Sequence, residues 1–165
     1  MMKQVIILIG LKGSGKTHIG TLAKEKLGID FFRVENVWLD LKSKRLSDEY
    51  MEEGFKLVET KIDNLLLDTN RIIIESTGTT IYFKFFLEKL KSKYEVKLVK
   101  INTSAEKCFQ RVKSRDASVH IPVSDDLLEK VNKEAQQVKL KYDTVIDNEE
   151  SSDTDIINRL KEIIN

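Results

Sequence analysis

The amino-acid sequence predicts an α/β protein with a parallel sheet between two layers of helices. Short apolar runs, typical of strands buried on both faces, alternate with segments whose apolar residues recur every three or four positions, as on one face of a helix. Such regular alternation implies right-handed crossover connections and a three-layer architecture. The 165 residues suit one domain spanning residues 1–165, which is long enough to bury a core.

The first half of the chain contains three of the predicted strands. Gln4–Ile9 is a continuous apolar run, and Lys16–Leu27 follows it as a helix with one apolar face. We expect a short strand at 31–34 and a third strand at 71–75, which contains three consecutive isoleucines. A long helical stretch between these strands is indicated by apolar residues that alternate by four and three positions, namely Met51, Phe55, Val58, Ile62 and Leu65.

The second half continues the same alternation. A helix with an aromatic face is predicted at 81–91, and a fourth strand at 96–101. Thr103 and Glu106 have the spacing of a capping box, which predicts the start of the next helix. A fifth strand at 142–146 precedes a closing helix with apolar residues at Ile156, Ile157, Leu160, Ile163 and Ile164. In sheets of this kind ligands bind beyond the carboxyl ends of the strands, so functional residues are expected there.

The composition excludes several classes of function. Lys and Arg number 28 and Asp and Glu 27, so a net charge of +1 gives no general field for nucleic acid or acidic membranes. Any anion site must therefore be local. The single cysteine, Cys108, excludes an internal disulfide framework and fits a reducing compartment. No apolar run is long enough to span a bilayer, so we expect a cytoplasmic protein without membrane contact.

Three of the seven glycines lie within six residues, between the first strand and the first helix. The segment at 10–17 is GLKGSGKT, which matches the phosphate-binding pattern G-x-x-x-x-G-K-[ST]. Glycines allow main-chain N–H groups to approach phosphate oxygens, and the following helix directs its positive end toward the same anions. We therefore predict a nucleotide-binding loop made of Gly10, Leu11, Lys12, Gly13, Ser14, Gly15, Lys16 and Thr17.

Specific roles follow for two residues of this loop and for one acid beyond the third strand. Lys16 is suited to bridge the β- and γ-phosphates as a compact charge, and the hydroxyl of Thr17 is suited to Mg²⁺. Glu75 follows the buried isoleucines, so it should leave the sheet at the ligand end and orient Mg²⁺ through water. A GTPase is disfavoured because the guanine-binding pattern N-K-x-D is replaced at 132–135 by NKEA, inside a predicted helix.

A local cationic cluster stands out from the neutral background. Arg111 and Arg115, two of only six arginines, lie four residues apart at the end of a predicted helix. An irregular segment containing the only proline, Pro122, follows them. Cations are favourable at any helix end, but beside a phosphate loop one guanidinium can stack on a base and another can clamp a phosphoryl group.

Together these motifs resemble the small P-loop kinases, namely adenylate, gluconate and shikimate kinases and the kinase domain of polynucleotide kinase. The resemblance covers nearly the whole chain in order. It includes the phosphate loop, the segment EEGFKLVE at 52–59, the strand end at 72–78, the arginine pair and residues 142–147.

The resemblance implies a P-loop NTPase fold with a five-stranded parallel sheet in the order 2-3-1-4-5. It implies a short lid at about 112–124 that closes over ATP, and an acceptor-binding helical region at about 36–68. By position, Arg111 and Arg115 look like the lid arginines of adenylate kinases, which stack on adenine and reach the γ-phosphate. Arg111 is thus expected to bind the nucleotide, and Arg115 to be catalytic.

The acceptor side departs from each of these families. The segment 52–59 resembles the E-E-x-F-R-x-x-E segment of shikimate kinases, whose arginine holds the substrate carboxylate, but Lys56 takes that position. Ser76, Thr77 and Gly78 stand where those kinases have three glycines, and Glu35 corresponds to their second aspartate after strand two. Polynucleotide kinases share the isoleucine-proline step of the lid, but their N-R-D-D motif is not matched. Candidate acceptor-binding residues are therefore Glu35, Lys56 and Gly78.

These features predict an ATP-dependent phosphotransferase that uses Mg²⁺ and a small hydroxyl-bearing acceptor, with the protein a monomer or a homodimer. Lys16, Arg115 and Mg²⁺ would neutralise the transferring group, and Glu35 would take the proton of the hydroxyl, with Asp40 as the alternative base. A nucleotide or polynucleotide 5′ end is the alternative acceptor, although the balanced charge disfavours long nucleic acids. An ATP-binding regulatory switch is the alternative from another class.

Overall fold

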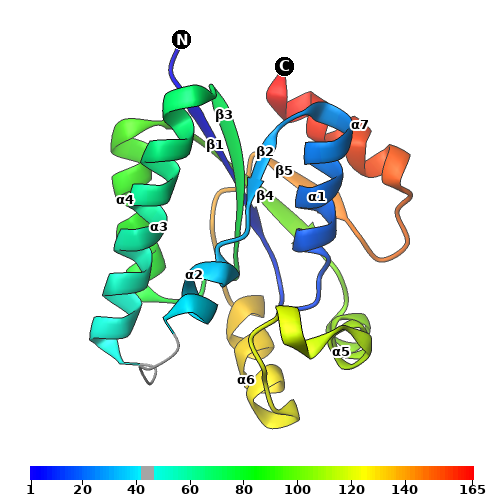
Figure 1. Ribbon diagram of the computed structural model, residues 1–165. Helices are drawn as coiled ribbons and strands as arrows, with labels where there is room; N and C mark the ends of the chain where they lie inside the picture. The colour runs from blue at the N-terminus through cyan, green and yellow to red at the C-terminus, as the bar shows by residue number, and fades with distance from the viewer. Residues whose placement is uncertain (42–46) are drawn as a thin grey trace.

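The computed structural model describes residues 1–41 and 47–165, and it contains a parallel sheet in the order β2-β3-β1-β4-β5 (Figure 1). Every adjacent pair of strands is parallel, so the predicted sheet and its order are confirmed. The strands are β1 (Gln4–Ile9), β2 (Asp30–Phe32), β3 (Arg71–Ser76), β4 (Glu95–Asn102) and β5 (Thr144–Asp147).

Helices cover both faces of the sheet, as Figure 1 shows. The helices α3 and α4 lie on one face, and α1 and α7 on the other. The helices α2, α5 and α6 gather beyond the carboxyl edge of the sheet, near the start of α1. The helices are α1 (Lys16–Leu27), α2 (Glu35–Asp40), α3 (Asp48–Asp68), α4 (Ile81–Lys93), α5 (Ala105–Ser114), α6 (Asp125–Gln136) and α7 (Asp153–Ile164), with a 3₁₀ turn at Ala117–Val119.

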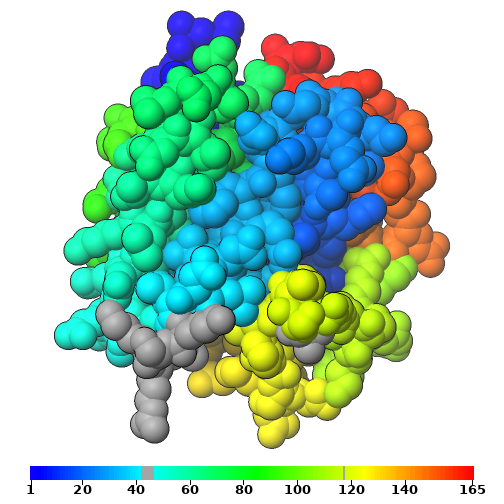
Figure 2. All heavy atoms as spheres, in the orientation of Figure 1, coloured from blue at the N-terminus to red at the C-terminus, as the bar shows by residue number. Residues whose placement is uncertain are grey.

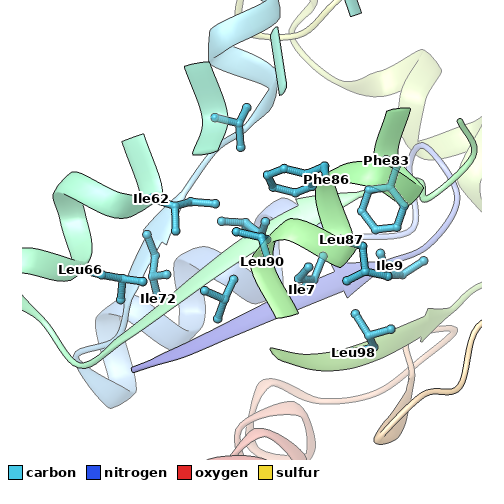
Figure 3. Packing of buried hydrophobic residues seen from close by; sticks show 13 residues of the cluster. Ile7, Ile9, Ile62, Leu66, Ile72, Phe83, Phe86, Leu87, Leu90 and Leu98 are labelled. Carbon is cyan, nitrogen blue, oxygen red and sulfur yellow. The ribbon is translucent and has the colours of Figure 1, made fainter. Parts of the chain in front are cut away.

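The central strand β1 explains why its sequence is apolar throughout rather than alternating. It pairs with β3 on one side and β4 on the other, and each face is covered by helices. Ile7 and Ile9 pack with Phe83 and Phe86 of α4, as the close view in Figure 3 shows, whereas Leu8 faces the cluster of α1 and α7. A strand buried on two sides needs apolar residues at every position.

Several boundaries differ from the prediction for local physical reasons. The second strand ends at Phe32 instead of 34, because Arg33 and Val34 lead directly into α2, which begins at Glu35. The helix α5 is capped by Ser104, whose hydroxyl accepts from the backbone N–H of Lys107, so the expected capping box at Thr103 is wrong. The helical region at 36–68 contains two helices, and residues 42–46 between them lie outside the described residues. Within the described ranges, none of the helices is both long and apolar enough to cross a membrane.

Candidate active site

The phosphate loop connects β1 to α1 at the carboxyl edge of the sheet. Gly13 and Gly15 have backbone φ angles of +90° and +97°, which residues with a Cβ atom rarely adopt. A Cβ atom on Gly13 would lie 2.4 Å from the carbonyl oxygen of Cys108, and one on Gly15 would lie 2.2 Å from Nδ2 of Asn148. Both glycines are therefore required by the backbone conformation and by the close approach of neighbouring elements.

Donors from distant parts of the chain converge on one carbonyl oxygen of this loop, that of Ser14. Oγ1 of Thr103 donates to it at 3.0 Å, and Nδ2 of Asn148 donates at 2.8 Å. Nη1 of Arg111 donates to the same oxygen at 3.4 Å. Thr103 follows β4, Asn148 follows β5 and Arg111 lies on α5, so three segments hold the orientation of this carbonyl group.

A second clamp on the loop comes from α6. Asn132 is 5% exposed, and its side-chain amide binds the backbone of Lys12 twice. Its Oδ1 accepts from the N–H of Lys12 at 2.8 Å, and its Nδ2 donates to the carbonyl oxygen of Lys12 at 3.0 Å. Because this N–H is used within the protein, Lys12 offers its side chain rather than its backbone to the cavity.

The ammonium group of Lys16 is folded over its own loop. Its Nζ donates to the carbonyl oxygens of Gly10 at 2.9 Å and Leu11 at 2.7 Å, and the residue is 8% exposed. Burial lowers the pKa of Lys16 to about 8, although the charge of Glu75 opposes this change. This ammonium group can exchange its two carbonyl partners for the phosphate oxygens of a bound nucleotide.

Thr17 and Glu75 form a pair of oxygen ligands next to Lys16. Oγ1 of Thr17 donates to Oε2 of Glu75 at 3.1 Å, while the buried Oε1 of Glu75 has no hydrogen-bond partner among the described residues. Burial raises the pKa of this carboxyl group, and the charge of Lys16 opposes the rise. Mg²⁺ prefers oxygen ligands and commonly combines one or two carboxylates with phosphate oxygens and water. The hydroxyl of Thr17 and the unpartnered oxygen of Glu75 fit such an ion.

Glu35 lies at the first position of α2 and is enclosed by basic groups. Its Oε1 accepts from the backbone N–H of Ile121 at 2.8 Å and lies 3.5 Å from Nζ of Lys12. Its Oε2 lies 3.1 Å from Nδ1 of His120 and 3.4 Å from Nη2 of Arg33. Burial raises the pKa of Glu35, but the hydrogen bond from Ile121 and the charge of Lys12 lower it by more. Glu35 is therefore held as a carboxylate.

The segment at 112–124 lies directly against this acid. In Figure 2 the yellow residues of this segment lie against the blue and cyan residues of β2 and α2. Besides the contacts of His120 and Ile121 with Glu35, Nη2 of Arg33 donates to the carbonyl oxygen of Val119 at 2.9 Å. The segment that the sequence predicts as a lid thus packs over the end of β2.

The two predicted arginines both line the cavity that contains these groups. Arg111 donates through Nη2 to the carbonyl oxygen of Asn148 at 3.0 Å, which ties α5 to the segment after β5. Arg115 follows the last residue of α5, and burial lowers the pKa of its guanidinium group, while the charges of Glu35 and Glu75 oppose this change. Arg115 lines the same cavity as both acids.

A cavity of about 560 Å³ joins these groups. Its wall includes Lys16 of the phosphate loop, Glu75 of β3, Glu35 at the start of α2, and aromatic residues of α2, α3 and α4. The residues predicted for nucleotide, metal and proton transfer that line it are Lys12, Gly13, Gly15, Lys16, Thr17, Glu35, Glu75, Arg111 and Arg115.

Six residues named from the sequence do not line this cavity. Gly10, Leu11 and Ser14 belong to the phosphate loop itself, and the other three are Lys56, Gly78 and Asp40. Lys56 is exposed on α3 and is not part of the cavity wall. Gly78 is likewise outside the wall, with a φ of +73° and the side chain of Val138 near its Cα atom, although its neighbours Thr77 and Thr79 line the cavity. Asp40 is exposed at the end of α2 and does not line the cavity either. The geometry therefore favours Glu35 over Asp40 as an acid within reach of a bound ligand.

Sequence reasoning missed the residues that support the site. Asn132, Asn148 and Thr103 contact the loop across 120, 134 and 89 positions, so no spacing within the loop indicates them. One indication was present for Asn148, since it directly follows a strand at the ligand edge of the sheet. The aromatic wall depends on the arrangement of α2, α3 and α4, which brings Trp38 and Phe55 to the cavity.

The sheet order, the glycine loop after β1 and the basic residues of the segment that packs over it define a P-loop kinase. A family model described as shikimate kinase matches residues 12–165, and the chain belongs to the shikimate kinase family. The resemblance noted from the motifs is thus confirmed. The chain is an ATP-dependent phosphotransferase of the class that phosphorylates an alcohol group.

Individual relatives agree with this placement. The chain is 23% identical over 158 residues to a shikimate kinase from Persephonella marina, which covers 94% of this chain and 95% of the relative. A sugar kinase structure from Janibacter sp. has a TM-score of 0.69 at 17% identity, covering 99% of this chain and 95% of that one. A shikimate kinase structure from Aquifex aeolicus has a TM-score of 0.63 at 19% identity, covering 97% and 95%. At these identities the structural matches support the fold.

Proposed function

We propose that the protein transfers the γ-phosphoryl group of ATP to a hydroxyl of a small acceptor that binds beyond Glu35. The observation that carries this proposal is one cavity whose wall contains Lys16, Thr17 and Glu75 together with Glu35 and the aromatic residues of α2, α3 and α4. Phosphoryl transfer requires two bound reactants in line, together with fixed charges around the moving group. A cavity with a phosphate site and an acid-lined neighbouring space supports that arrangement.

The phosphate end would bind the nucleotide through the loop at 10–17. Lys16 would leave the carbonyl oxygens of Gly10 and Leu11 for the β- and γ-phosphates, to which it offers a compact charge. Arg111, beside the segment after β5, would lie along the adenine. Thr17 and Glu75 would hold Mg²⁺, which supplies charge neutralisation on phosphate oxygens when bound.

Beyond the phosphates, Glu35 would accept the proton of the acceptor hydroxyl. Its lowered pKa keeps it ionised near neutral pH, as a proton acceptor must be. As the oxygen of the acceptor hydroxyl forms its bond to the γ-phosphorus, the bond from that phosphorus to the β,γ-bridging oxygen breaks and ADP leaves. Arg115 and Lys16 would oppose the negative charge on the transferring group.

Entry of an acceptor would require a rearrangement of the segment around residue 120. The oxygens of Glu35 accept from Ile121 and contact His120 in the structure, so a hydroxyl group must replace at least one of these partners. The proposed lid function of 112–124 follows from this competition. When the hydroxyl binds, the lid must lose one of its contacts with Glu35, and it would then cover the reactants.

A coupled assay of ADP release tests the proposal. The purified protein would be supplied with ATP, Mg²⁺ and, in turn, shikimate, sugar acids, nucleosides, nucleoside monophosphates and short 5′-hydroxyl oligonucleotides. Release that depends on a hydroxyl compound, with a phosphorylated product identified by mass, supports the transferase. Tight ATP binding without turnover of any compound would instead favour a nucleotide-dependent switch.

A further inference from the structure

The cavity changes in chemical character beyond Glu35. The acceptor end, as we call it, is lined by Trp38, Met51, Phe55 and Phe83 from the helices and by Ile121 and Pro122 from the lid segment. Side-chain hydroxyls near these residues come from the end of β3 and the turn after it, at Ser76, Thr77, Thr79 and Thr80. The part of the wall that α2, α3 and α4 contribute is apolar apart from Glu35.

From this contrast we propose that the acceptor is an alcohol carried on a flat apolar or aromatic ring, which packs against Trp38 and Phe55 and turns its hydroxyl toward Glu35. This inference rests on the proposed transfer to a hydroxyl and names the class of compound that receives the phosphoryl group. A polyhydroxylated ring would place several hydroxyl groups against apolar walls, where each unpaired group is unfavourable.

Trp38 is held in place before any ligand binds. Its indole ring meets Phe55 edge to face at a centroid distance of 5.2 Å and an angle of 77°, and meets Tyr50 at 6.4 Å and 80°. The hydroxyl of Tyr50 donates to the backbone carbonyl oxygen of Trp38 at 3.2 Å. A ring wall that is already ordered loses little conformational freedom when a flat ligand packs on it.

Gly54 leaves the space that this indole ring occupies. A Cβ atom at Gly54 would lie 2.8 Å from two atoms of the Trp38 ring, closer than such contacts occur. Gly54 lies within the continuous helix α3, where alanine would be the better helix former. The missing side chain at this position therefore makes room for the Trp38 ring. The aromatic wall is thus built into the helix against local helix propensity.

The helices that carry the aromatic rings contribute no cationic group to the cavity wall that could hold the carboxylate of a polyol, among the described residues. Lys56 occupies the position at which shikimate kinases resembled by this chain have a carboxylate-holding arginine, and it is exposed on α3 outside the cavity. Lys12 reaches the cavity, but its ammonium group lies 3.5 Å from Glu35. Basic groups elsewhere on the cavity wall come from the phosphate loop and α1, from Arg111 and Arg115, and from His120, which lies 3.1 Å from Glu35. Among the described residues, α2, α3 and α4 contribute only Glu35 and apolar side chains to the wall.

Trp38 is the only tryptophan of the chain, so its fluorescence reports directly on this compartment. The full chain with ADP and Mg²⁺ would be titrated with benzyl alcohol, meta-hydroxymethylbenzoate, shikimate and gluconate. We expect the two aromatic alcohols to change the emission with dissociation constants at least about tenfold lower than those of the two polyols. Equal or tighter binding of shikimate or gluconate would overturn the inference.

Two substitutions test the wall itself against a matched control. Trp38→Leu and Gly54→Ala should each raise KM for the better aromatic alcohol by about tenfold, with KM for ATP changed less than about twofold. Phe85→Leu, on α4 but 62% exposed and outside the cavity, should change neither constant. Because the added Cβ atom of Gly54→Ala would meet the Trp38 ring, urea unfolding must accompany its kinetics, and the raised acceptor KM supports the inference when the variant unfolds as a folded protein does and keeps its KM for ATP.

The outcomes separate this inference from the proposed function. If the aromatic alcohols bind but no compound is phosphorylated, the binding class stands and the transfer proposal fails. If shikimate is phosphorylated efficiently and both wall variants leave the acceptor KM unchanged, the transfer proposal stands and the aromatic acceptor is refuted. An unchanged ratio of aromatic to polyol kcat/KM in Trp38→Leu also refutes it.

Discussion

Hydrogen bonds hold the phosphate end of the cavity, whereas packed rings hold the acceptor end. At the first, Asn132 and Asn148 bind loop backbone groups at 2.8 to 3.0 Å. At the second, Trp38 and Phe55 meet at ring distances with no side-chain hydrogen bond between them. A hydrogen bond requires one geometry of donor and acceptor, whereas an apolar wall tolerates the substitution of its side chains by others of similar volume. The fold can therefore keep one nucleotide site while its acceptor changes.

The largest expected effect comes from the phosphate end. Lys16→Ala should lower kcat by about 10³-fold or more, because a fixed charge beside the transferring phosphoryl group is lost. The fold should remain intact, since the substitution removes a buried charge rather than core area. Circular dichroism and a coupled assay would measure the two properties. Activity within tenfold of the wild type would remove this lysine from the mechanism.

A smaller loss is expected at the boundary between the two ends. Glu35→Gln should reduce kcat by about 10² to 10⁴-fold for an alcohol acceptor, because an amide cannot take the hydroxyl proton. The dissociation constant of ATP, measured by calorimetry, should change by less than about threefold in that variant. Asp40→Asn is the matched control, being exposed at the other end of the same helix, and a comparable loss there would make Asp40 the base.

The clamp from α6 should contribute to both stability and nucleotide binding. Asn132→Ala leaves two backbone groups of Lys12 without partners and should lower the free energy of unfolding by about 1–3 kcal/mol. We also expect KM for ATP to rise severalfold, because the loop becomes less ordered. Urea unfolding and initial rates would measure these changes, with the exposed Asn158→Ala as the control. An unaltered KM would limit the clamp to a structural role.

The contacts of the lid segment with Glu35 predict a dependence of stability on pH. Folding lowers the pKa of Glu35 from 4.5, so its stabilising contribution is present above that pH and is lost as the pH falls through the folded value. Between about pH 6 and about pH 3 the wild type should lose about 1 kcal/mol more unfolding free energy than Glu35→Gln. If the unfolding free energy of the two proteins changed with pH by the same amount, the contacts of the lid segment with Glu35 would not stabilise the fold.

The smallest effect is expected at Lys56. Because this side chain is exposed and lies outside the cavity, Lys56→Met should alter the acceptor KM by less than about twofold. Steady-state kinetics at saturating ATP would measure it. A tenfold rise would mean that this lysine holds the acceptor, as its alignment with the shikimate kinase segment suggests, and would weaken the contrast between the two ends.

The two ends also differ in how far the sequence predicts them. The phosphate loop is continuous, so its spacing alone indicates the ligand class, and β1 and β3 are recognisable because burial on both faces leaves apolar runs. Glu35 and Glu75 could be found because Glu35 comes shortly after β2 and Glu75 is near the end of β3, at the ligand edge of the sheet. The acceptor end depends on how α2, α3 and α4 pack, and side chains such as Phe55 have the same helical spacing whether they face a core or a cavity.

The carbonyl group of Ser14, which three donors hold, has a consequence for the rest of its peptide unit. In a planar trans peptide the C=O and the following N–H point in opposite directions. Fixing the oxygen of Ser14 toward Thr103 and Asn148 therefore aims the N–H of Gly15 to the opposite side, away from those residues. The segments after β4 and β5 thus fix the orientation of the peptide dipole between Ser14 and Gly15. Substitutions at Thr103 or Asn148 would therefore change the affinity of the phosphate loop for an anion that neither side chain contacts.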